Sequence, residues 1–255
     1  MDHTTDPVAD VPQLPQSTGE ATMTQKLENI QADPIAYGQP RPMLGMLHYR
    51  TLKRPLDIVW ACGLLVLFGP LMALIAIAIK LHSPGPVLYR QQRIGRGGVP
   101  FMMLKFRSMR LNNDGDMHRR HMQRLIKENI RPEDLGMQSL KMERDPRITG
   151  VGKLLRKVGL DELPQLFNVL CGDMSLVGPR PPLPYEYELY TERHKQRLQV
   201  IPGLTGLWQV TAHNLVSFEE MVQLDLDYIN TMSLRLDLQI MLSTPREMLR
   251  GKGGG

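Results

Sequence analysis

Cysteines and recognisable metal-binding motifs are scarce in this chain of 255 residues. The two cysteines, Cys62 and Cys171, form no Cys-x-x-Cys pair, and Cys62 lies within an apolar run. A structural disulfide is therefore not expected, which fits a reducing cytosolic setting. The seven histidines show neither HExxH nor HxH spacing, which argues against a zinc site.

Aromatic side chains are also few, at 5% of the residues. Single-stranded nucleic acid binds largely by stacking on aromatic rings, so their scarcity argues against such a partner. The formal net charge is +5 and the pI is about 9.3. This balance suits nucleic acid, an anionic membrane surface or a phosphorylated substrate, and does not choose among them. Because no nucleic-acid recognition motif is present either, we expect no nucleic-acid partner.

The first part of the chain lacks the features of a folded segment. Residues 1–48 are rich in proline, threonine, glutamine and aspartate, which predicts a poorly ordered polar tail, and their start is too polar for a signal peptide. The composition then changes three times. We predict a membrane helix over 49–82, a catalytic domain over 83–215 and C-terminal helices over 216–255.

A long apolar run follows the tail. No charged side chain occurs from Ile58 to Ile79, and about 20 such residues are enough to cross a bilayer. Gly69 and Pro70 fall in the middle, where proline kinks or breaks a helix. Basic residues flank both ends, so the positive-inside rule cannot orient a simple span. Two interpretations stay open at this point: a broken helix that enters and leaves by one face, and a crossing helix with a mild kink.

A compact basic segment comes next. The strand-like runs 87–91 and 101–107 are joined by a glycine-rich stretch, which predicts a β-hairpin. Lys105 and Arg107 alternate with Phe106 and therefore share one face of the strand. They form either a phosphate-binding pair or a solvated strand face.

Two adjacent carboxylates, Asp161 and Glu162, lie at what the sequence predicts to be the start of a helix, with Arg156 just upstream. In a basic setting such a pair suggests chemistry on a phosphate, where one carboxylate attacks and the other holds a divalent metal. The alternative is that Asp161 is only the N-cap of the helix. Arg180 follows downstream in the sequence Gly-Pro-Arg-Pro, and its guanidinium suits phosphate oxygens.

The last part of the chain is expected to contain a turn and strand over 201–210 and two helices. Ser217 and Glu220 have the spacing of a capping box that opens the first helix, which carries Asp225. The second helix, from Leu234 to Arg250, has many apolar residues. It either lies in a membrane interface or packs against the core.

Six motifs occur in one order along the chain, beginning with a Lys-Arg-Pro-Leu-Asp sequence that precedes the apolar run. They are Lys53–Asp57, Lys105–Met109, Leu160–Leu166, Gly172–Ser175, Val177–Pro181 and Pro202–Gly206. Together they resemble the bacterial sugar transferase family, the monotopic phosphoglycosyl transferases, over about residues 49–251. The resemblance is to the short form, which lacks the additional N-terminal membrane helices of larger members.

The resemblance implies transfer of a sugar 1-phosphate from a UDP-sugar to undecaprenyl phosphate, with release of UMP and use of Mg²⁺. It implies that Asp161 is the nucleophile, forming a covalent phosphosugar intermediate, and that Glu162, with Asp161, holds the metal. Matching family positions suggest that Lys105, Arg156 and Arg180 contact phosphate. Asp225 matches a further acidic position.

The resemblance also implies a fold and a location. The fold class is mixed α/β, mostly helical with a small β-sheet, a re-entrant membrane helix broken at Gly69 and Pro70, and interfacial amphipathic helices. The location is the cytoplasmic face of the bacterial inner membrane, in contact with lipid and with a possible homo-oligomeric state. Such enzymes start the assembly of exopolysaccharide, capsule or O-antigen.

Two positions depart from the family pattern. His213 stands where an arginine is usual, so its expected role in substrate binding depends on a side chain that is charged only near or below neutral pH. Gly69 precedes Pro70 where some members have serine. The alternative to an enzyme is a catalytically silent membrane scaffold of the same fold.

Overall fold

The structure, a computed structural model, describes residues 43–109, 116–129, 148–212 and 216–249. Residues 1–42 of the predicted polar tail, and His213, lie outside these ranges. Residues 43–48 were predicted as the end of that tail and are instead the first residues of a long helix, so the tail boundary at residue 48 is wrong. The described chain is mostly helical with two small two-stranded sheets, which confirms the predicted fold class at that level.

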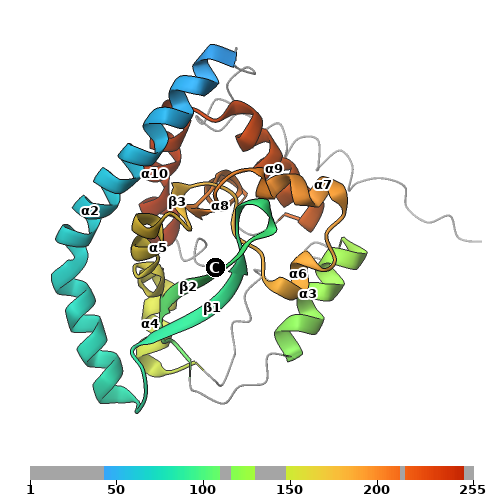
Figure 1. Cartoon of the computed structure of the whole chain (residues 1–255). Helices are drawn as coiled ribbons and strands as arrows, with labels where there is room; N and C mark the ends of the chain where they lie inside the picture. Colours follow the sequence, from blue (N-terminus) through green and yellow to red (C-terminus); the bar gives the residue numbers. More distant parts are fainter. Residues whose placement is uncertain (1–42, 110–115, 130–147, 213–215, 250–255) are drawn as a thin grey trace, which may run out of the picture. The chain divides into compact units, whose positions relative to one another are not determined.

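Helix α2 (Met43–His82) is the longest element. It contains both Pro55 and Pro70, and the helix continues through Gly69 and Pro70. The expected break is thus a bend within one continuous helix, which Figure 1 shows near the middle of α2. Proline removes one backbone hydrogen bond and crowds the preceding turn, and neighbouring bonds are enough to keep the two halves helical.

Much of α2 carries apolar side chains that nothing in the described structure covers. The segment Thr51–His82 has a mean hydropathy of 2.6 in its most apolar window, and only 17% of that window is buried. Val66 is 81% exposed and Leu81 is 84% exposed. The described residues contain this one helix of a length and composition that could cross a membrane.

The predicted basic hairpin is confirmed. Strands β1 (Leu88–Ile94) and β2 (Pro100–Phe106) pair antiparallel, with Leu88 opposite Phe106 and Ile94 opposite Pro100. The turn between them holds the short 3₁₀ helix η1 (Arg96–Gly98). Helix α3 (Asp116–Glu128) then follows.

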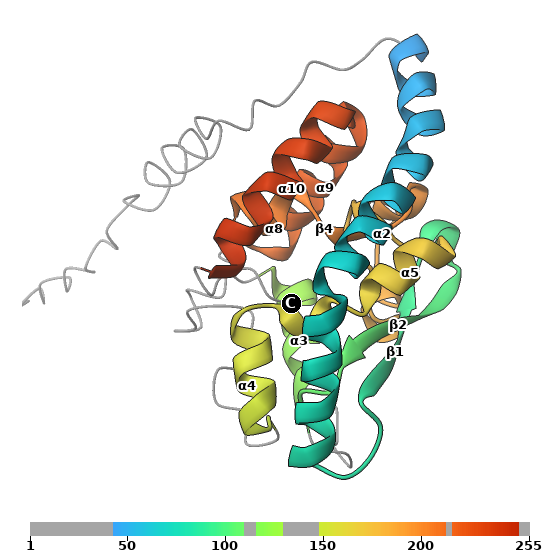
Figure 2. The same cartoon turned by 90° about the vertical axis from the view of Figure 1, so that its left-hand side faces the viewer.

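The next elements connect the hairpin to α2. Helix α4 (Gly150–Lys157) is capped by the Thr149 side chain, and the 3₁₀ helix η3 (Leu160–Glu162) and helix α5 (Gln165–Cys171) follow it. Asn168 of α5 bonds the backbone of β2, accepting from Leu104 N at 2.9 Å and donating to Met102 O at 2.8 Å. Figure 2 shows α5 beside α2, and Arg54 of α2 donates to the carbonyl oxygens of Val169 and Leu170 at the end of α5.

A second, parallel sheet lies between the helices. Strand β3 (Ser175–Val177) pairs with β4 (Gly203–Thr205), and all three residues of β3 are buried. The chain between these strands forms α6 (Pro184–Tyr187), α7 (Glu192–Lys195) and the 3₁₀ helix η4 (Gln196–Gln199). Residues 207–210 were expected to continue a strand. This is wrong: strand β4 ends at Thr205, and after the extended Gly206 these residues belong to α8 (Leu207–Thr211).

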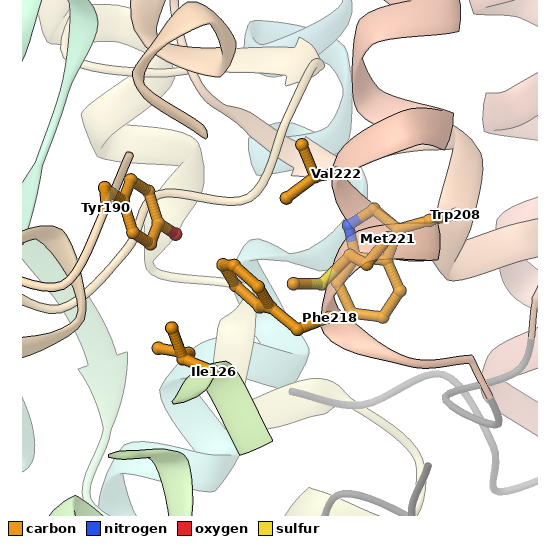
Figure 3. Close-up of a cluster of buried hydrophobic side chains, with 6 residues drawn as sticks. All are labelled: Ile126, Tyr190, Trp208, Phe218, Met221 and Val222. Atoms are coloured by element: carbon orange, nitrogen blue, oxygen red, sulfur yellow. The ribbon is translucent and has the colours of Figure 1, made fainter. Parts of the chain in front are cut away.

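Helices α9 (Phe218–Thr231) and α10 (Leu234–Leu249) complete the described chain. The predicted capping box is present, since Ser217 N donates to Glu220 Oε2 at 2.7 Å and Ser217 Oγ accepts from Glu220 N. Figure 3 shows the apolar cluster that packs α9 against α3 and α8. Its buried members are Ile126, Tyr190, Trp208, Phe218, Met221 and Val222.

Helix α10 has two faces. Leu236 and Ile240 are buried, at 3% and 0% exposure, so this face packs in the interior. Leu238 and Leu242 are exposed on the same helix. The core-packing interpretation is therefore correct for one face, and the interfacial role of the other face stays a prediction.

Candidate active site

The carboxylate pair lies in a tight turn between two helices. Gly159 has a φ of 69°, in the left-handed region that favours glycine, and ends α4. Asp161 and Glu162 occupy η3, and Pro164 is the N-cap of α5. The N-cap interpretation of Asp161 is wrong: the two carboxylates precede the cap position, and Pro164, with its fixed φ, occupies that position itself.

Both carboxylates are largely withdrawn from water and stand beside cations. Asp161 is 5% exposed and Glu162 is 8% exposed. Lys105, on β2, donates to Glu162 Oε1 at 2.7 Å. Burial and then the Glu162 charge raise the pKa of Asp161, whereas the charges of Lys105 and Arg156 lower it. Burial lowers the pKa of Lys105, against the influence of Glu162.

Arg180 adds positive charge to the same neighbourhood. Its guanidinium acts to lower the pKa of both Lys105 and Arg93, which places the three cations within electrostatic reach of one another. Arg180 itself is only partly buried. The structure thus pairs Lys105 with Glu162, next to Asp161, and the charges of Arg156 and Arg180 act on this group, although the five predicted residues derive from four separate segments. Oxygen atoms of a phosphate or diphosphate would find matching donors here.

Arg93 belongs to this group and was not among the predicted site residues. It is 5% exposed, donates to Pro181 O at 2.9 Å and to Gln91 Oε1 at 2.9 Å, and its pKa is lowered to about 10 by burial and by Arg180. No sequence signal separates it from the exposed Arg90 nearby, apart from its position three residues later on the strand.

Two predicted binding residues bond elsewhere. Arg107 donates to Pro84 O at 2.9 Å and to Ser83 O at 2.7 Å, so its guanidinium holds the turn after α2. Asp225 is fully buried in α9 and lies 2.6 Å from Arg197 Nη2. Burial raises the pKa of Asp225 to about 6, although Arg197 opposes this. In both cases the observed partner is a group of the protein, so a substrate contact stays a prediction, as it does for His213.

The ligands that Asp161 and Glu162 offer can be compared with those that Mg²⁺ requires. Among the described residues, no group of three or more His, Cys, Asp or Glu side chains could hold a metal ion. Magnesium is, however, commonly bound by one or two carboxylates, with waters and substrate phosphates completing the shell. Asp161 and Glu162 fit that pattern if the substrate supplies the remaining oxygens.

Comparison with known proteins decides the family. Residues 48–251 match the bacterial sugar transferase family. The chain belongs to this family. The match confirms the resemblance that the six motifs carried, and its limits agree with the predicted extent of about 49–251.

Named relatives are similar over the same region. The galactosyl transferase CpsE of Streptococcus agalactiae is 42% identical over 79% of this chain and 43% of its own length. The undecaprenyl-phosphate galactose phosphotransferase of Salmonella typhimurium is 40% identical over 80% of this chain and 42% of its own length. The chain thus spans less than half of these two relatives. It spans 89% of the exopolysaccharide production protein ExoY of Sinorhizobium fredii, at 39% identity.

Proposed function

We propose that this protein transfers a sugar 1-phosphate from a UDP-sugar to undecaprenyl phosphate and releases UMP, as the first membrane step of exopolysaccharide, capsule or O-antigen assembly. The observation that carries the proposal is the buried Asp161–Glu162 pair beside Lys105, with Arg156 and Arg180 nearby. The names of the relatives support the substrates: a Caulobacter vibrioides relative, 43% identical over 77% of this chain, is a UDP-glucose:undecaprenyl-phosphate glucose-1-phosphate transferase.

In the first step, a carboxylate oxygen of Asp161 attacks the phosphorus that bears the sugar. An oxygen–phosphorus bond forms, the bond from that phosphorus to the bridging oxygen breaks, and UMP leaves with the bridging oxygen and its electron pair. In the second step, a phosphate oxygen of the lipid attacks the same phosphorus and releases the Asp161 carboxylate. Dividing the transfer in this way lets UMP leave before the bulky lipid arrives.

The cations of the site have distinct tasks in this scheme. Lys105 holds Glu162 and presents positive charge beside Asp161. Arg156 and Arg180 bind the phosphate oxygens on which negative charge accumulates during transfer. A Mg²⁺ held by Glu162 and Asp161 would neutralise further charge on the diphosphate when bound.

Helix α2 supports a membrane location. Its uncovered apolar surface supports contact with lipid, and the bend of α2 in Figure 1, together with Pro70 inside the helix, supports a re-entrant course in the cytoplasmic leaflet of the inner membrane. Both basic ends of the helix then stay on the cytoplasmic side. The exposed leucines of α10 are suited to the same interface.

The decisive experiment measures UMP release by detergent-solubilised protein with Mg²⁺ and undecaprenyl phosphate, across a panel that includes UDP-glucose and UDP-galactose. Asp161→Asn should lower UMP release at least a thousandfold, because an amide cannot act as the nucleophile. Asp227→Asn, on the surface of α9, is the matched control and should retain full activity. Near-normal turnover by Asp161→Asn would remove the assignment, and no UMP from well-folded wild-type protein with any donor would favour the silent scaffold.

A further inference from the structure

A cluster of buried polar side chains joins α2 to the interior of the protein. We call it the α2 polar cluster; its members are Tyr49, Lys53, Asp57, Ser175, Tyr228 and Asp237. Five of the six are at most 5% exposed, and the Lys53 side chain is 16% exposed. The site described above uses none of them.

The ionic part of the cluster links α2 to α10. Lys53 Nζ lies 2.7 Å from Asp237 Oδ2 and 3.2 Å from Asp57 Oδ1. Tyr49 donates to Asp237 Oδ2 at 3.0 Å. Two carboxylates and one ammonium are costly to bury, and they are stable only when every hydrogen bond has good geometry. Such a cluster therefore selects one position of α2 more sharply than apolar packing does.

The same cluster forms hydrogen bonds with every residue of strand β3. Asp57 accepts from Ser175 Oγ at 2.8 Å and from Leu176 N at 3.3 Å. The hydroxyl of Tyr228 lies 3.1 Å from Val177 O and 2.8 Å from Asp237 Oδ1, and shares its one proton between these acceptors. Each residue of the strand is thus bound to the cluster.

Strand β3 leads directly into the segment that carries Arg180. Gly178 N donates to Thr205 O at 2.9 Å, and Gly203 N donates to Pro179 O at 2.9 Å, so the segment is also tied to β4. Pro179 and Pro181 have fixed φ angles and stiffen the chain on both sides of Arg180. A shift of β3 would therefore carry through to the guanidinium of Arg180, three residues beyond Val177.

We infer that the membrane helix α2 positions Arg180 for phosphate binding, through the α2 polar cluster and strand β3. This inference rests on the proposed function for its kinetic consequence. Tyr228, Ser175 and Asp57 are positioning residues, since they act through the strand and touch neither substrate nor the reacting atoms.

The test removes single hydroxyl groups on the two sides of β3 in the full-length protein. Tyr228→Phe and Ser175→Ala should each lower kcat/KM for the UDP-sugar about tenfold. Amide hydrogen exchange in residues 176–180 should become faster, while exchange in α4 stays unchanged. Tyr187→Phe, which removes a hydroxyl outside the cluster, is the control for both measurements.

Each outcome is decisive. Wild-type kinetics and unchanged exchange in both variants would overturn the inference, and so would a lower Tm with unchanged kinetics, because that result describes a purely structural cluster. If the wild-type protein releases no UMP, the proposed function fails separately. Exchange in residues 176–180 then decides the inference by itself, and no increase in either variant overturns it.

Discussion

The guanidinium of Arg93 connects strand β1 to the segment that carries Arg180. It binds Pro181 O and Gln91 Oε1 together, and it stands within electrostatic reach of Arg180 and Glu162. Arg93→Lys keeps the charge but loses the planar fork that makes these contacts simultaneously. Hydrogen bonds to charged groups contribute about 1.5–3 kcal/mol, so kcat/KM for the UDP-sugar should fall by roughly tenfold or more.

Arg90→Lys provides the matched control, because Arg90 lies on the same strand and is exposed. Steady-state UMP release should be unchanged in this variant. Equal kinetics for the two variants would show that only the charge at position 93 matters.

Residue chemistry and the family resemblance together pointed to residues that the structure places near one another, while their roles stay predictions. The adjacency of Asp161 and Glu162 and the basic character of Lys105, Arg156 and Arg180 could be seen in the sequence, and the structure brings these five together. The alternation of Lys105 and Arg107 does not say which partner each side chain meets. Arg107 binds the turn at Ser83 and Pro84, and Asp225 pairs with Arg197, because contacts between distant segments decide both.

At the scale of elements, the position of α4 depends on one close approach. A Cβ atom added to Gly152 would stand 2.0 Å from Ser108 O and 2.7 Å from Ser108 Cα. Gly152→Ala must therefore push α4 away from the end of β2, and Arg156 moves with the helix. Overpacking of this kind costs about 1–3 kcal/mol, so Tm in detergent should fall by several degrees and UMP release should fall with it.

Gly63→Ala tests whether any added methyl group has this effect. A Cβ at Gly63, inside α2, meets no atom within 4 Å. Alanine is favoured over glycine in a helix by roughly 0.5–1 kcal/mol, so Tm should stay the same or rise. A fall in Tm as large as that of Gly152→Ala would contradict the steric account.

The elements that the sequence predicted best are those with local signals. The hairpin and the capping box at Ser217 both follow from neighbouring residues. The parallel pairing of β3 with β4 could not be predicted in the same way. Each strand has three residues, which is too short for a periodic pattern, and the pairing joins distant segments.

At the scale of the whole molecule, the accessibility of the two cysteine thiols tests the proposed membrane location of α2. Both are exposed in the structure, Cys62 on the apolar surface of α2 and Cys171 at the end of α5. In inverted inner-membrane vesicles a membrane-impermeant maleimide should label Cys171 and leave Cys62 unlabelled. Lipid covers the first site in this arrangement, and water reaches the second.

Single-cysteine proteins make the labelling specific. Cys62→Ala should keep the full signal and Cys171→Ala should lose it, as measured by mass shift. A membrane-permeant maleimide should then label Cys62 in the Cys171→Ala protein. Rapid labelling of Cys62 by the impermeant reagent would contradict the membrane location of α2.

The sequence separation within the α2 polar cluster has a consequence for biosynthesis. Tyr49 and its partner Asp237 are 188 positions apart, so at 5–20 residues per second the ribosome needs about 10–40 s between them. Throughout this interval Lys53 can pair with Asp57 on the same helix, one turn away. Lys53 therefore has a carboxylate partner within α2 before Asp237 is made, and the contacts of Tyr49 and Lys53 with Asp237 form only after the C-terminal helices have been synthesised.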